Sequence, residues 1–157
     1  MPKITESEYA PLKAFFVSFI ERLPLPATLP PERHPVAVLD ATEKTSKASA
    51  RLGLGLALND LLEMSWHFTP DEVAAIDREF SARGIVTLSE MRRRYSRQFR
   101  GVLKRGKIRT EEEFYLVSGI LASFTTDASD DERRKLDEMV GAYEESAKAR
   151  DGENEHS

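Results

Sequence analysis

Residues 69–124 read TPDEVAAIDREFSARGIVTLSEMRRRYSRQFRGVLKRGKIRTEEEFYLVSGILASF, and this stretch decides the fold class. Three segments in it begin with the same signal, a threonine followed three residues later by a glutamate. In this spacing the two side chains can cap the exposed backbone N–H groups of a helix start. Apolar residues then recur every three or four positions, as they do along the buried face of a helix. The stretch therefore predicts three successive helices, which begin at Thr69, Thr87 and Thr110.

The rest of the chain supports the same fold class. Apolar spacing predicts further helices over residues 6–23, over residues 46–66 and from Asp130 to about Ala147. We therefore expect an all-α, single-domain bundle of about five to six helices within residues 1–147, the last four joined by short connections. Residues 24–40, which contain five of the eight prolines, are expected to form a loop. Residues 148–157 are expected to form a disordered acidic tail.

One segment is open to two interpretations. Leucines alternate with other residues between Leu52 and Leu58, as in a strand, and Gly53 and Gly55 lie between them. The neighbouring alanines favour a helix, and the leucines keep helical spacing as far as Leu62. We predict a helix in which each glycine costs about 1 kcal/mol relative to alanine, so that close approach of another helix is expected.

Composition excludes several classes of protein. The chain has 157 residues and no cysteine, which excludes disulfide scaffolds, thiolate zinc sites and cysteine nucleophiles. Its apolar segments are all shorter than the roughly 20 residues that a membrane-spanning helix needs. The first residues are acidic where a signal peptide would be basic, so we expect a cytoplasmic protein without a membrane partner.

Basic residues are concentrated in one segment. Between Arg83 and Arg109 there are ten lysines and arginines against the single acid Glu90, a charge of +9. The remaining 13 basic and 26 acidic residues give −13. Since the predicted helix from Thr87 to about Gly106 places its apolar residues on one side, most of its arginines are expected to form a stripe on the other.

The stripe is the candidate functional site. Arginine forks match phosphate geometry, so we predict nucleic-acid binding, in which phosphate contacts matter more than reading of the bases. The expected nucleic-acid-binding residues are Arg93, Arg94, Arg97, Arg100, Lys104, Arg105, Lys107 and Arg109. A helix-turn-helix formed with the preceding helix is one version of this hypothesis.

Two alternatives remain open for the basic segment. Acids of the same chain can neutralise it, and the candidates are Glu111, Glu112, Glu113, Asp127, Asp130, Asp131 and Glu132. Otherwise its partner is an acidic protein surface. Arg92 is set apart from the stripe because it falls on the apolar side of the helix, where its head group is expected to reach the edge of the core or a carboxylate.

Catalytic residues are not indicated. Three histidines are present, and His67 beside Asp71 and Glu72 comes nearest to an acid–base pair, but it is better explained as a helix-start residue that packs against Trp66. We therefore predict an accessory or regulatory protein, not an enzyme, that binds nucleic acid without a cofactor or metal. The alternative is a protein–protein interaction module that uses its basic face or the Leu/Gly segment, including self-association as a homodimer.

Overall fold

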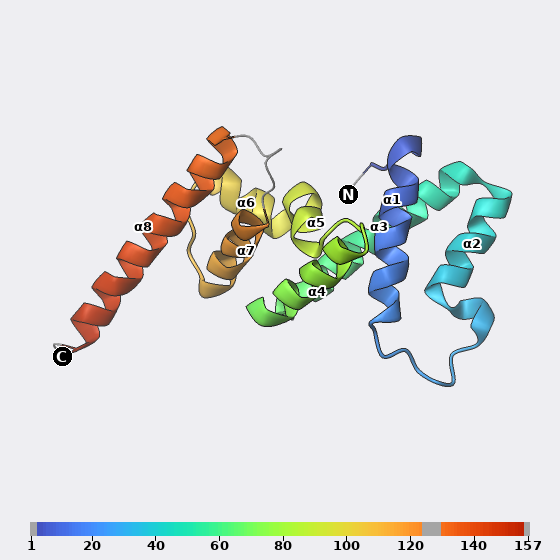
Figure 1. The fold of residues 1–157 in the computed structure, drawn as a ribbon, viewed down its shortest axis with the longest axis horizontal. Helices are drawn as coiled ribbons and strands as arrows, with labels where there is room; N and C mark the ends of the chain where they lie inside the picture. The colour runs from blue at the N-terminus through green and yellow to red at the C-terminus, as the bar shows by residue number, and fades with distance from the viewer. Residues whose placement is uncertain (1–2, 124–129, 156–157) are drawn as a thin grey trace. The chain divides into compact units, whose positions relative to one another are not determined.

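The computed structural model describes residues 3–123 and 130–155, and we call these the described residues (Figure 1). All regular secondary structure in them is helical, as the sequence predicted. The described residues form eight α-helices, where five to six were expected. They are α1 (Glu6–Glu21), α2 (Pro35–Thr45), α3 (Lys47–Met64), α4 (Pro70–Ala82), α5 (Leu88–Tyr95), α6 (Arg97–Arg105), α7 (Glu111–Ala122) and α8 (Asp130–Glu155), with short 3-10 helices η1 (Pro31–Arg33) and η2 (Ser65–His67).

The chain divides into two compact units. The first consists of Met1–His67 and Arg78–Thr87, and the second of Phe68–Asp77 and Leu88–Ser157. Helix α4 thus begins in the second unit and ends in the first. The helix ends before Gly84, which has a left-handed φ of 71° that glycine adopts without strain.

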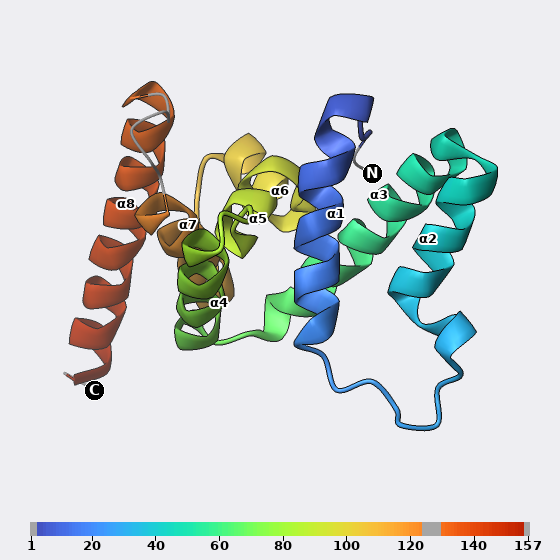
Figure 2. The same cartoon turned by 45° about the vertical axis from the view of Figure 1, so that its right-hand side comes forward.

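The first unit is built from α1, α2 and α3. Helices α2 and α3 form a hairpin whose bend is at Ser46, and both contact α1 (Figure 2). Phe15 of α1 lies at the centre of the core, with its ring centroid 5.7 Å from that of Phe19 and 5.6 Å from that of Phe80. Such tilted and edge-to-face contacts are favourable arrangements of aromatic rings.

The second unit is organised around α7, which contacts α5, α6 and α8. Its core side chains are almost fully buried and come from all four of these helices: Leu88, Met91, Phe99, Val102, Val117, Ile120 and Leu136. Apart from the buried Arg92, the basic residues of α5 and α6 lie on the surfaces that this core leaves outside.

The Leu/Gly segment is helical, as predicted, and the strand interpretation was wrong. Leu54, Leu58 and Leu61 line the buried face of α3, whereas Leu52 and Leu56 are 56% and 47% exposed. A Cβ atom added to Gly53 would meet no other residue within 4 Å. The close approach that we expected at Gly53 is therefore not made within the described residues.

The predicted loop over residues 24–40 was wrong in its second half, because α2 begins at Pro35. Proline lacks an N–H, but the first turn of a helix has no intrahelical acceptor for that group. The ring Nδ1 of His34 caps the helix by accepting a hydrogen bond from the backbone N–H of Val36 at 3.2 Å. Pro35 therefore begins a helix within the segment that was expected to form a loop.

The prediction of a single basic helix from Thr87 to Gly106 was also wrong, because the helix is broken at Ser96. This residue has an extended backbone, with φ −68° and ψ 126°, and its hydroxyl accepts a hydrogen bond from the N–H of Phe99 at 3.2 Å. A serine that caps a new helix in this way ends the preceding one. The predicted stop at Gly106 is confirmed by its φ of 75°.

Helix α8 extends further than the predicted one. It continues to Glu155, across most of the segment that was expected to form a disordered tail. Lysine, alanine and glutamate between Glu144 and Lys148 are good helix formers, which favours continuation of the helix without further buried residues.

Candidate nucleic-acid interface

The eight predicted binding residues are divided over three segments of the second unit. Arg93 and Arg94 belong to α5, and Arg97, Arg100, Lys104 and Arg105 belong to α6. Lys107 and Arg109 lie in the connection to α7. Because of the break at Ser96, the stripe expected on one helix is split after its first members.

Arg93 and Arg94 of α5 are neutralised by acids of the same chain. Arg93 binds both carboxylate oxygens of Glu90, at 2.6 and 2.9 Å, and lies 3.4 Å from Glu132 of α8. The Nε of Arg94 donates to Glu90 at 2.9 Å. Burial alone would raise the pKa of Glu90, but the hydrogen bonds from Arg93 and Arg94 outweigh it and lower the pKa. The hydrogen bonds that Arg93 itself donates to Glu90 raise the pKa of Arg93.

Arg105 is neutralised in the same way at the other end of α6. Its guanidinium donates to Glu113 of α7 at 2.5 Å, and Glu113 also accepts the backbone N–H of Arg109 at 2.8 Å. Burial would raise the pKa of Glu113, and these donors reverse the effect and lower it. Of the acids proposed from the sequence as internal partners, Glu113 and Glu132 therefore fulfil that role; Asp127 lies outside the described residues.

Five cations remain available for an external partner, and we call them the α6 basic face: Arg97, Arg100, Lys104, Lys107 and Arg109. All five are exposed. Within the described residues none of their side chains forms an ion pair. The guanidinium of Arg100 donates to the backbone carbonyl of Arg94 at 3.1 Å, which leaves its charge uncompensated.

Helical spacing brings the α6 members of this face together. At about 100° per residue, Arg97, Arg100 and Lys104 fall within about 60° of one another. The buried residues Phe99 and Val102 lie on the opposite side, against the core of the second unit. The core therefore fixes the direction in which the basic face points.

Sequence reasoning missed Lys135 of α8. Its ammonium group donates to the backbone carbonyl of Leu103 at 3.5 Å, which places an exposed cation at the C-terminal end of α6. Negative partial charge at a helix C-terminus attracts such a cation. No local signal links the two residues, because they are 32 positions apart and meet through the fold of the unit.

Arg92 has the structural role expected of it. Its side chain is 7% exposed, and desolvation lowers its pKa to about 10, while the nearby carboxylate of Asp77 opposes this shift. Gln98, the one amide among the arginines, is half-buried, and the hydroxyl of Ser96 lies 3.2 Å from it. Neither side chain belongs to the α6 basic face.

Comparison with protein-family models, with curated proteins and with solved structures gives no match. Function is therefore argued from the residues of this chain. Each helix of the described residues is too short or too polar to cross a membrane. Among the same residues, no three histidine, aspartate or glutamate side chains gather as they would around a metal ion.

Proposed function

We propose that this protein binds nucleic acid through the α6 basic face, by contacts with the phosphate backbone. One observation carries the proposal. Acids of the second unit neutralise Arg93, Arg94 and Arg105, but leave five neighbouring cations exposed and without an acidic partner in the described residues. Like charges so close together destabilise a free helix surface. A polyanion would relieve this repulsion.

The dimensions of the face suit a phosphate backbone. From Arg97 to Lys104 the helix rises about 10 Å, which matches the rise of about three nucleotides of one DNA strand. Arginine also donates two parallel hydrogen bonds to a phosphate. A diffuse acidic protein surface presents acceptors for such paired bonds less regularly than a phosphate backbone does. Lys135 would extend the face at the end of α6.

Contact with phosphates favours binding without sequence preference. Bases are read by side chains that enter a groove, commonly arginine, asparagine or glutamine. The amide of Gln98 is hydrogen-bonded beside Ser96, and the recognition helix of a helix-turn-helix would here be broken at that serine. We thus infer an accessory protein of the cytoplasm that binds nucleic acid and does not modify it.

The test is fluorescence anisotropy of labelled double-stranded and single-stranded DNA and RNA at several salt concentrations. Five phosphate contacts predict a slope of about −4.5 for the logarithm of affinity against the logarithm of salt on duplex DNA. Replacing Arg97, Arg100 and Lys104 by glutamate is expected to remove at least three contacts. The slope should then become less steep by about 3.

A matched control separates local charge from net charge. Arg33, Lys44 and Lys47 are exposed cations of the first unit, and their replacement by glutamate changes the net charge equally. This control variant should bind as the unmodified protein does. Equal losses in both triple variants, or no binding by the unmodified protein at low salt, would contradict the proposal.

A second candidate function, self-association, is favoured by the outer face of α3. Leu52 and Leu56 are exposed there beside Gly53, whose missing side chain leaves room for another backbone. An antiparallel second copy would place leucines against leucines across this face.

Sedimentation over a concentration range tests this second candidate. We expect the mass to rise with concentration, and the double substitution Leu52→Glu with Leu56→Glu to keep the protein monomeric. Tyr115→Glu, at an exposed position of the second unit, is the control and should leave association unchanged. A mass that stays monomeric at every concentration would exclude the homodimer and leave the nucleic-acid proposal untouched.

A further inference from the structure

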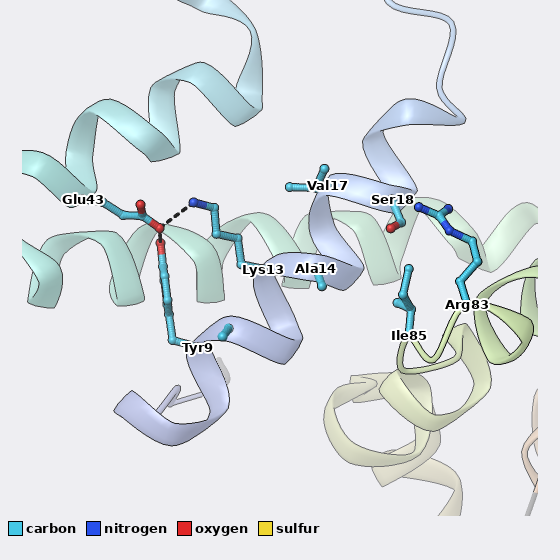
Figure 3. A pocket seen from close by; sticks show the side chains of 9 residues that line it. Tyr9, Lys13, Ala14, Val17, Ser18, Glu43, Arg83 and Ile85 are labelled. Carbon is cyan, nitrogen blue, oxygen red and sulfur yellow. Dashed lines mark hydrogen bonds and ion pairs between the residues drawn. The ribbon is translucent and has the colours of Figure 1, made fainter.

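The first unit carries a groove that the proposed function does not use. It has a volume of about 540 Å³ and follows one side of α1, between α2 and the segment after α4 (Figure 3). Its middle is apolar and is formed by Ala14 and Val17 of α1 with Ile85. Polar groups lie at its two ends, and these ends differ in charge.

One end is electrostatically satisfied. Glu43 accepts hydrogen bonds from the ammonium of Lys13 at 2.7 Å and from the hydroxyl of Tyr9 at 2.5 Å. Lys13 also binds Asp40 at 2.7 Å. Because each charged group there already has a partner, this end offers no strong attraction for an ion.

The other end carries donors that are unused. Ser18 is 4% exposed, and it lines the groove without a hydrogen bond from its hydroxyl to any described residue. Arg83 lines the same end, with its guanidinium exposed and without an ion pair in the described residues. Figure 3 shows both side chains at this end, beside Ile85. The Ser18 hydroxyl and the Arg83 guanidinium are therefore both open to a ligand that enters this end of the groove.

We propose that this end of the groove binds the C-terminal carboxylate of an apolar peptide. A guanidinium and a hydroxyl together supply the charge and the donors that a carboxylate accepts. The side chain of the last peptide residue would lie over Val17 and Ile85. From Ser18 to Tyr9 the helix rises about 13 Å, which is the length of about four extended residues.

The length of the groove selects a peptide over a small organic acid. A free acid would fill the end at Arg83 and leave the apolar middle uncovered. A peptide chain would cover that middle and reach the end at Glu43, where the charged groups already have partners and no second charge is required of the peptide.

The experiment is a titration of the full chain, by calorimetry and by amide chemical shifts, with the tetrapeptide acetyl-Ala-Ala-Val-Leu as the free acid and as the C-terminal amide. We expect the acid to bind and to shift the amides of Val17, Ser18 and Ile85. Loss of the charge in the amide should weaken affinity about tenfold or more, since a charge-assisted contact is removed.

Variants then assign the binding to the two donors. Arg83→Gln should weaken the acid about tenfold and bring it to the affinity of the amide, and Ser18→Ala should weaken it by a smaller factor. Arg33→Gln removes an exposed arginine of the same unit away from the groove, and it should change nothing. Circular dichroism of each variant verifies that the helices are intact.

Three results would overturn the proposal. The first is equal affinity for acid and amide, and the second is an equal loss in Arg83→Gln and Arg33→Gln. The third is equal affinity for acetyl-leucine and the tetrapeptide, which would identify a small acid as the ligand. None of them bears on nucleic-acid binding, because the α6 basic face belongs to the other unit.

Discussion

The carboxylate of Asp77 interacts with two residues of α5. It accepts hydrogen bonds from the backbone N–H of Ser89 at 3.1 Å and from the Ser89 hydroxyl at 2.5 Å, in the first turn of α5. It also lies close enough to Arg92 to favour the charged form of that buried guanidinium. The residue therefore caps a helix and compensates a charge that burial would otherwise penalise.

Removing this carboxylate should be costly. We expect Asp77→Ala to lower the free energy of unfolding by about 2–4 kcal/mol, because it removes a cap and leaves Arg92 with less compensation. Urea denaturation followed by circular dichroism measures the change. Asp71→Ala, at an exposed position of the same helix, should cost less than about 0.5 kcal/mol. A similar cost for both substitutions would show that Asp77 has no special role.

The break between α5 and α6 shows what helical periodicity detects and what it misses. Met91, Phe99 and Val102 are all buried, as the apolar spacing predicted. A single extended residue at Ser96 interrupts the hydrogen bonds but preserves the apolar pattern on both sides, so the pattern predicted one helix. Ser96 was the signal for a helix break in the sequence, since a serine inside an amphipathic segment is a candidate cap.

Substitution of Ser96 tests the importance of this cap. We expect Ser96→Ala to lower the free energy of unfolding by about 1–2 kcal/mol, because the N–H of Phe99 loses its acceptor in a buried place. Hydrogen exchange at the Phe99 amide should become faster in the same variant. Ser81→Ala, on the exposed side of α4, is the control and should change stability by less than about 0.5 kcal/mol. Unchanged exchange at Phe99 would show that the cap is unimportant.

For the whole chain, local signals predicted more than long-range ones. Helix starts at Thr69 and Thr110 and stops at Gly84 and Gly106 could be predicted because capping depends on neighbouring residues. The pairing of Arg93 with Glu132 depends on the approach of α8 to α5, which one sequence does not specify. Sequence alone therefore located the basic segment, but could not decide which of its cations are neutralised.

Acid stability combines such pairings across both units. Hydrogen bonds from Lys13 and Tyr9 lower the pKa of Glu43 in the first unit. In the second unit, burial would raise the pKa values of Glu90 and Glu113, and hydrogen bonds from arginines outweigh it and lower both. A carboxyl with a lowered pKa in the folded state contributes stability above its unfolded pKa, near 4.5 here, and loses that contribution as the pH falls through the folded value.

We therefore expect the free energy of unfolding to be constant near neutral pH and to decrease below about pH 5, as these carboxylates become protonated. Glu90→Gln should make the decrease shallower, because the substituted side chain no longer binds a proton on unfolding. Glu112→Gln makes the same change of charge at an exposed position of α7 and is the control. Urea denaturation from neutral pH down to about pH 3 gives both curves. Parallel curves for all three proteins would show that the pairing of Glu90 with Arg93 and Arg94 does not contribute to folding. These ion pairs on α5 would then need another explanation.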